Sequence, residues 1–187
     1  MDGEEIAMST FVVYASKYGA TQGIAERIAG RLAAPGQDVP VRSASAAGDV
    51  AGYDAFVIGS AAYMGSWRKE AVEFVRLNRS VLATRPVWLF SSGPLGTATT
   101  DAQGRDLLAV SEPRQFAEFA ETVGPRALRV FFGALDPSRL RFADRLVRRM
   151  PAGRALLPEG EFGDWSAIDA WADRVASELG RLTATAR

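Results

Sequence analysis

Phe11–Thr21, with the sequence FVVYASKYGAT, decides the fold of this chain. An apolar run ends in a short loop of small and hydroxyl-bearing residues, and Ile24, Ile28 and Leu32 follow at the spacing of one helical face. A buried strand that turns directly into a helix points unpaired backbone N–H groups and the positive end of the helix dipole at one place. The pattern favours an anion site over an ordinary strand-to-helix turn.

The residue types in this loop suit a phosphate group. The hydroxyls of Ser16 and Thr21 can donate hydrogen bonds to an anion, and Gly19 lets the backbone approach it closely. Lys17 is one of only two lysines in the chain, beside twenty arginines. We therefore expect a phosphate-bearing ligand at a loop made of Ser16, Lys17, Tyr18, Gly19, Ala20 and Thr21.

The composition of the 187 residues excludes several classes of function. Cysteine and histidine are both absent, which rules out disulfides, iron–sulfur clusters, a Ser-His-Asp hydrolase and a typical zinc site, so no metal is expected. The formal charge is zero, and nothing in this balance points to nucleic acid. Any proton transfer would fall to carboxylates, tyrosine, water or a cofactor.

Targeting signals are not apparent in the sequence. Residues 1–9 are acidic and lack the basic-then-apolar order of a signal peptide, and no apolar run is long enough to span a bilayer. We expect a cytoplasmic protein with a single domain over residues 10–182 and flexible tails at 1–9 and 183–187.

Apolar runs alternate with helical patterns along most of the chain. Strands are predicted at 11–14, 39–42, 55–59, 86–91 and 127–133. Helices are predicted after the first strand, at 70–77, from 112 to about 123, and after an N-cap at Asp164. The alternation predicts an α/β fold, with a five-stranded parallel sheet covered by helices on both faces.

The alternation breaks between Gly133 and Phe162. Residues 137–150 carry five arginines against one aspartate, and their apolar residues follow helical spacing: Leu140, Ala143, Leu146, Val147 and Met150. A basic amphipathic helix of this kind suits an anionic membrane surface or an acidic partner. Two alternatives stay open, a helix packed on its own domain with solvated arginines, and a homodimer interface.

These motifs resemble the flavodoxin family. Ser16–Thr21 stands where that family has its FMN phosphate loop, and Tyr53–Gly65 resembles its second flavin loop with the strand before it. The resemblance implies a doubly wound sheet of order 2-1-3-4-5, with 137–158 as the long-chain insertion and Gly160–Phe162 resuming the last strand. Tyr18 departs from the family pattern, because flavodoxins usually have a threonine hydroxyl there; its phenol or the charge of Lys17 would compensate.

Within the family the chain resembles the menaquinone-dependent protoporphyrinogen dehydrogenase group in particular. The likeness rests on Gly59–Gly65, Phe132–Leu135 and Gly163–Trp165, and spans Thr10 to Leu182. It implies an FMN-dependent oxidoreductase that passes electrons from a reduced substrate, such as a porphyrinogen, to a quinone or a redox partner protein. The arginines of 137–150 would meet porphyrin propionates, and this segment would bring the flavin to the inner face of the membrane.

The resemblance also places the flavin ring between two further loops. In the second loop, Tyr63 or Trp67 suits stacking on the ring, with packing under the next helix as the alternative for Trp67. The third loop has no aromatic residue, which leaves that face open to a substrate, and its glycines offer N–H groups to the ring. No catalytic residue is assigned, and the implied cofactor-binding residues of these loops are Ala61, Ala62, Tyr63, Met64, Gly65, Trp67, Ser92, Gly93, Pro94, Leu95 and Gly96.

Charge near the second loop separates an enzyme from an electron carrier. Arg68 and Lys69 follow the loop, and Glu70 is the nearest acid. Positive charge close to the flavin favours its anionic reduced form and raises its potential, which indicates a redox enzyme unless both cations face solvent. A flavodoxin-type electron carrier and a flavodoxin-like interaction module without cofactor remain alternatives.

Overall fold

The computed structural model describes residues 8–34, 38–140, 142–151, 153 and 157–185. Its main sheet has five parallel strands: β1 (Thr10–Ala15), β2 (Val41–Ser43), β3 (Ala55–Tyr63), β5 (Val87–Ser92) and β6 (Ala127–Phe131). They lie in the order β2-β1-β3-β5-β6, and the short β4 (Ser66–Trp67) pairs antiparallel with the end of β3. The predicted doubly wound parallel sheet and its order are confirmed.

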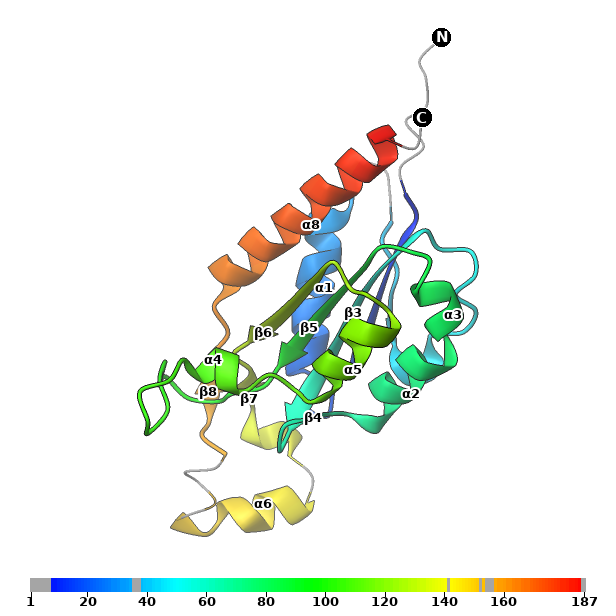
Figure 1. The fold of residues 1–187 in the computed structure, drawn as a ribbon. Helices are drawn as coiled ribbons and strands as arrows, with labels where there is room; N and C mark the ends of the chain where they lie inside the picture. The colour runs from blue at the N-terminus through cyan, green and yellow to red at the C-terminus, as the bar shows by residue number, and fades with distance from the viewer. Residues whose placement is uncertain (1–7, 35–37, 141, 152, 154–156, 186–187) are drawn as a thin grey trace.

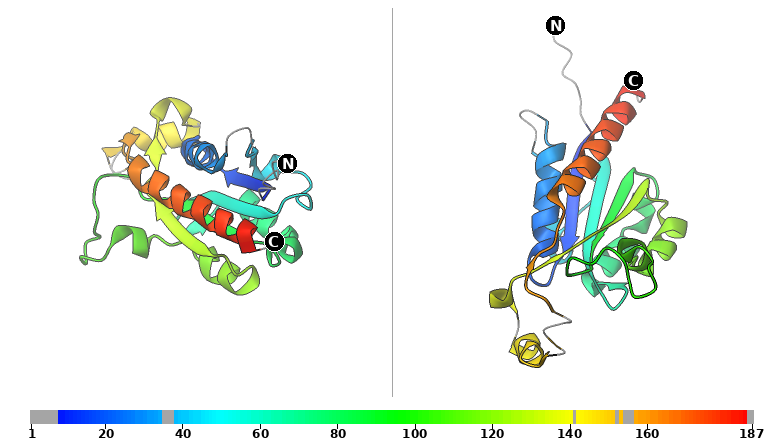
Figure 2. Two further views of the ribbon diagram at one scale, coloured as in Figure 1. Left: turned by 90° about the horizontal axis from the view of Figure 1, so that it is seen from above. Right: turned by 90° about the vertical axis from the view of Figure 1, so that its left-hand side faces the viewer.

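Helices cover both faces of this sheet (Figure 2). On one face lie α1 (Ala20–Leu32) and α8 (Trp165–Thr185), and on the other α2 (Lys69–Leu77), α3 (Arg79–Leu82) and α5 (Gln115–Thr122). Because side chains alternate along a strand, Phe11 and Val13 enter one core while Val12 enters the other, and all three are buried. Two covered faces explain why the strands read as continuous apolar runs.

The C-terminal helix is longer than predicted. Asp164 is its N-cap, as expected, since its Oδ1 accepts a hydrogen bond of 3.0 Å from the backbone N–H of Ala167. The helix continues through Thr185, beyond the predicted domain boundary at residue 182. At the other end, Ser9 is bound to Asp54 by its backbone N–H and its hydroxyl, so the domain includes Ser9 as well. The remaining residues of the two predicted tails, except Met8, lie outside the described residues.

The insertion leaves and re-enters the domain through a small ladder of its own. Strand β7 (Ala134–Leu135) pairs antiparallel with β8 (Gly160–Glu161), with Leu135 opposite Gly160. The prediction that Gly160–Phe162 resumes the last strand of the main sheet is therefore wrong. The chain reverses direction through the insertion, so the returning segment runs antiparallel to the outgoing one and pairs with it.

The basic segment is not one continuous helix. A 3₁₀ turn, η2 (Pro137–Arg139), ends at Leu140, whose backbone is extended (φ −64°, ψ 139°), and α6 (Phe142–Arg148) follows. Leu140 is buried, and the helix after it projects beyond the sheet edge formed by the C-terminal ends of the strands (Figure 1). Two shorter elements complete the chain, η1 (Ala44–Ala46) and α4 (Leu107–Val110). Among the described residues, no helix combines the length and hydropathy needed to cross a bilayer.

Candidate cofactor site

The turn between β1 and α1 has the geometry of an anion site. Gly19 occupies the N-cap of α1 in a left-handed conformation (φ 93°), which favours glycine, and no described side chain caps this helix end. The Oγ of Ser16 accepts a 2.9 Å hydrogen bond from the Gly19 N–H, so its own O–H is left to donate. The backbone N–H groups of the first turn of α1 therefore face the loop without a side-chain partner.

Lys17 and Tyr18 contact the insertion. The Nζ of Lys17 lies 2.7 Å from Oδ2 of Asp144 on α6, and the Tyr18 hydroxyl contacts the same oxygen. The Lys17 ammonium also lies 4.8 Å from the ring centroid of Tyr18 and 5.7 Å from that of Tyr63. The loop, the second predicted site loop and the insertion meet at this one cation.

These contacts move the pKa values of the loop residues. Partial desolvation lowers the pKa of Lys17, but hydrogen bonds to Asp144 and Tyr18 outweigh it, and the pKa is raised overall. Burial, together with the hydrogen bond to Asp144, raises the pKa of the Tyr18 phenol. Lys17 is therefore charged and Tyr18 neutral throughout the physiological range.

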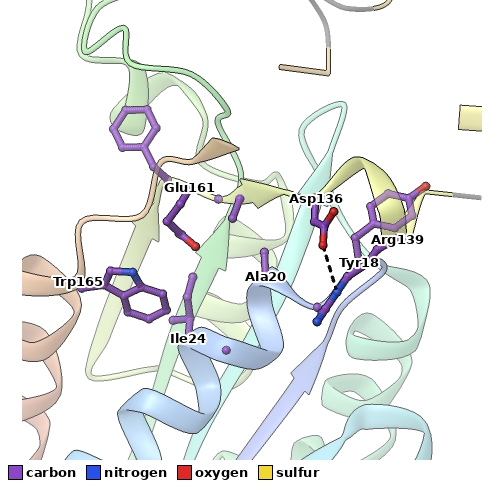
Figure 3. A pocket seen from close by; sticks show the side chains of 12 residues that line it. Tyr18, Ala20, Ile24, Asp136, Arg139, Glu161 and Trp165 are labelled. Atoms are coloured by element: carbon purple, nitrogen blue, oxygen red, sulfur yellow. Dashed lines mark ion pairs between the residues drawn. The ribbon is translucent and has the colours of Figure 1, made fainter. Parts of the chain in front are cut away.

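Arg139 is a site residue that the sequence did not reveal. Its guanidinium lies over Gly19, so close that a methyl group at that glycine would collide with it, and it forms a 3.8 Å ion pair with Asp136 (Figure 3). The sequence marks Arg139 only as one arginine in a basic run, 120 positions away from the glycine that it contacts. The loop thus has two cationic side chains, Lys17 and Arg139.

Two cavities flank the loop, and Arg139 lines both. One, of about 330 Å³, extends over Ser43–Ser45 and reaches Arg68. The other, of about 250 Å³, lies between α1 and the start of α8, where Ile24, Glu161 and Trp165 face it (Figure 3).

Only one of the two cations after the second loop faces a cavity. Arg68 lines the larger cavity and forms a 2.6 Å ion pair with Glu70, whose pKa is lowered by a backbone hydrogen bond and by this arginine. Lys69 is 84% exposed and pairs with Glu73 at 3.4 Å on the outer side of α2. Of the two cations that could both have faced solvent, only Lys69 does so.

A narrow slot connects the three predicted loops. Ser16, Tyr18, Ala20 and Thr21 line it from the first loop, Ala61–Tyr63 from the second, and Ser92, Gly93 and Leu95 from the third. Gly133–Leu135 and Leu157, at the two ends of the insertion, line it as well. Its volume of about 50 Å³ is far below the 300–1,000 Å³ of ordinary ligand pockets, so a ring enters only when these loops separate.

Tyr63 has the position expected of a stacking residue, and Trp67 does not. Tyr63 lines the slot with 42% of its surface exposed, and burial raises the pKa of its phenol. Trp67 is only 4% exposed, with its ring 5.7 Å from that of Phe116 and 5.6 Å from that of Phe119. The structure corrects the assignment of Trp67 to the ring site and favours the alternative that it packs under a helix.

Several other predicted site residues are placed differently from their expected roles. Thr21 and Ser92 are buried, and their hydroxyl oxygens lie 2.7 Å apart, so Thr21 pairs across the core. The N–H of Gly93 donates to the Phe131 carbonyl at 3.1 Å and is thus already used. Besides Trp67, four predicted residues of the second and third loops are not among those that line the slot: Met64, Gly65, Pro94 and Gly96.

Comparison with solved structures supports the same fold. A flavodoxin from the domain Archaea is 18% identical, with a TM-score of 0.54 over 92% of this chain and 99% of that one. A WrbA-like flavodoxin from Agrobacterium tumefaciens is 16% identical, with a TM-score of 0.55 over 94% and 99%. Rubredoxin oxygen:oxidoreductase from Desulfovibrio gigas is 12% identical, with a TM-score of 0.58 over 95% of this chain and 38% of that one. At these identities the likeness concerns the fold alone.

The family is established by sequence. None of the curated proteins compared with this chain matches it. The family model described as a flavodoxin domain matches residues 11–153, which is more than half of the chain and includes the phosphate loop and the first part of the insertion. The chain therefore belongs to the flavodoxin domain family.

Proposed function

We propose that this protein is an FMN-dependent oxidoreductase that passes electrons from a reduced substrate to a quinone-type acceptor. The observation that carries the proposal is the anion site at the N-terminus of α1, in a family whose members typically bind FMN. The phosphate would be held by the Ser16 hydroxyl, by the backbone N–H groups of the first helical turn, and by Lys17 and Arg139. When bound, FMN supplies the two-electron redox chemistry, and the protein binds it and orients it.

The donor set fits a phosphate monoester. Such a group carries close to two negative charges at neutral pH and has three strong acceptor oxygens. An uncapped helix end, a hydroxyl donor and two cations match that charge and that number of acceptors. Asp136 and Asp144 form ion pairs with these two cations, at 3.8 Å to Arg139 and 2.7 Å to Lys17.

The cavity of about 250 Å³ supports a substrate of this protein's own. It shares Tyr18, Ala20, Gly133 and Ala134 with the slot, so the two lie next to each other. The Trp165 ring and Ile24 offer apolar surface there, beside the charged side chains of Asp136, Arg139 and Glu161. An apolar ring system, such as that of a porphyrinogen, suits the surface of Trp165 and Ile24.

A flavodoxin-type electron carrier is the second candidate. It is favoured by the likeness to flavodoxins over almost the whole length of both chains. A carrier needs no substrate cavity, and it works at a potential below that of free FMN. The third alternative, a module without cofactor, is the one that would leave the loop occupied by its contact with Asp144.

The visible spectrum of the purified protein, followed by titration with FMN, tests the proposal. We expect a yellow protein, or stoichiometric uptake of added FMN with a change in flavin absorbance. A colourless protein that takes up no FMN would favour the module without cofactor. If FMN binds, its midpoint potential separates the other two candidates, since a value well below that of free FMN would favour the carrier.

A further inference from the structure

The insertion presents an apolar helix face that none of the described residues covers. Phe142, Leu146 and Met150 are 82%, 53% and 56% exposed, and Val147 is exposed beside them. Phe142 and Leu146 lie one turn apart on the same face of α6, and Met150 lies in the turn that follows the helix. Several large apolar side chains exposed together indicate an interaction surface, whereas a single exposed apolar residue does not.

An arginine-lined hollow adjoins this face. Its volume is about 290 Å³, and it is lined by Pro137, Leu140, Arg145, Arg148 and Arg149. Arg148 pairs with Glu159 at 2.9 Å, but no described carboxylate forms an ion pair with Arg145 or Arg149. The three arginines of the hollow lie within residues 145–149, in a chain whose formal charge is zero. Positive charge is thus concentrated beside the exposed apolar face.

The position of α6 leaves the face open. The helix lies apart from the sheet, beyond the C-terminal ends of the strands (Figures 1 and 2). Whatever binds the outer side of α6 therefore meets no other layer of the domain.

We propose that α6 docks this edge of the protein on an anionic lipid surface. The apolar side chains would enter the boundary between head groups and acyl chains, and the arginine-lined hollow would take a lipid phosphate. A protein partner fits less well, because a helix of seven residues is only about 10 Å long and a stable interface needs ~800 Å² from each partner. The basic side chains match the negative head groups of an anionic bilayer, and the apolar side chains match its acyl chains.

This inference does not depend on the cofactor. The residues that carry it are those of the apolar face and of the hollow, and Arg139, which the proposed function assigns to the phosphate, is not among them. Lipid binding without FMN, or FMN binding without lipid binding, would each separate the two proposals.

The test is co-sedimentation of the full chain with vesicles. We expect binding to vesicles of equal parts phosphatidylglycerol and phosphatidylcholine, little binding to pure phosphatidylcholine, and loss of binding at high salt. The F142S/L146S and R145E/R149E variants should each lower the partition constant by at least about tenfold. Far-UV circular dichroism and FMN uptake check that each variant is folded.

Matched controls lie on other elements. L77S removes an apolar side chain that is 83% exposed on α2, and R79E/R174E reverses two exposed arginines on α3 and α8. Both should bind vesicles like the wild type. The proposal is overturned if the wild type ignores anionic vesicles, or if the α6 variants bind like the controls. It is also overturned if the α6 face forms a dimer instead, or if the chain binds soluble glycerol phosphate but no vesicle.

Discussion

Lys17 contacts three other side chains of the site. It pairs with Asp144 at 2.7 Å, lies over the ring of Tyr18, and faces the ring of Tyr63. A lysine is a compact charge on a flexible stem, so it can remain near the loop while its partner changes. We therefore assign it the largest electrostatic share in phosphate binding.

Replacing Lys17 by glutamine should weaken FMN binding by about ten- to hundredfold, since a hydrogen bond between charged groups contributes ~1.5–3 kcal/mol. The other lysine of the chain supplies the control. Lys69 is exposed and pairs with Glu73, so K69Q should bind FMN like the wild type. Fluorescence titration of FMN measures both constants, and equal affinities for K17Q and wild type would remove Lys17 from the site.

The pH dependence of FMN affinity should come from the ligand and not from the loop. The chain has no histidine, and the pKa values of Lys17 and Tyr18 are both raised, so neither group loses its proton between about pH 7 and pH 9. The second proton of a phosphate monoester leaves near pH ~6. Affinity should rise from pH 5 to pH 7 and then stay constant. A loss of affinity between pH 7 and pH 9, measured by the same titration, would contradict this assignment.

The buried pair Thr21–Ser92 should contribute to stability. Their oxygens are 2.7 Å apart, and each hydroxyl would lose its partner if the other were removed. We expect T21V to lower the free energy of unfolding by about 1–3 kcal/mol, because it leaves a buried hydroxyl unsatisfied. The double variant T21V/S92A should recover part of that loss, as urea unfolding of the full cycle would show. Additive losses would mean that the two hydroxyls do not interact.

At the scale of elements, Asp144 on α6 contacts Lys17 and Tyr18 of the loop between β1 and α1. Asp144 places a carboxylate beside the cation that we assign to the ligand phosphate. Two anions compete for one ammonium, so the contact lowers the fraction of molecules ready to bind. The insertion thus takes part in the site, although its helix lies outside the sheet.

Removing the Asp144 carboxylate should therefore tighten FMN binding. We expect D144A to lower the dissociation constant roughly threefold by ending this competition. Trypsin should also cleave D144A faster within residues 145–149, because α6 loses a contact to the domain. Weaker FMN binding in D144A would show instead that Asp144 organises the loop for its ligand.

The sequence predicted the strands and helices well and their long-range contacts poorly. The alternation of buried runs is a local property, and it gave all five parallel strands. The apolar run predicted a strand that ends at Gly59, whereas β3 continues to Tyr63. The pattern missed Ser60 and Ala61 because they are small residues, although the main sheet buries both. Arg139 and Asp144 join the loop across more than 100 residues, and no local pattern encodes such a contact.

At the scale of the whole molecule, two closely packed cores fix the main sheet. At Gly59 the absence of a side chain is required, because the Phe90 ring of the neighbouring strand occupies the space that a methyl group would need. Arg27 and Arg31 on α1 pair with Asp169 and Asp173 on α8 across the same face. The insertion contributes little to these cores, since of its residues Leu140 is buried but most of α6 is exposed.

Excising residues 136–159 should leave the domain folded. Leu135 and Gly160 face each other at the end of the β7–β8 ladder, so a two-residue Asn-Gly turn can join them as a hairpin. We expect cooperative thermal unfolding within about 5 °C of the full chain, together with complete loss of vesicle binding. Failure of the shortened chain to unfold cooperatively would show that the insertion is part of the core.

The ladder of β7 and β8 has a consequence for how such proteins diversify. The insertion can be exchanged as a unit, because its two ends meet at one pair of facing residues, Leu135 and Gly160. The insertion carries the side chains that contact Lys17 and Gly19 as well as those that face outward. Exchange of the insertion between homologues would therefore change both membrane binding and ligand affinity, while the main sheet stays the same.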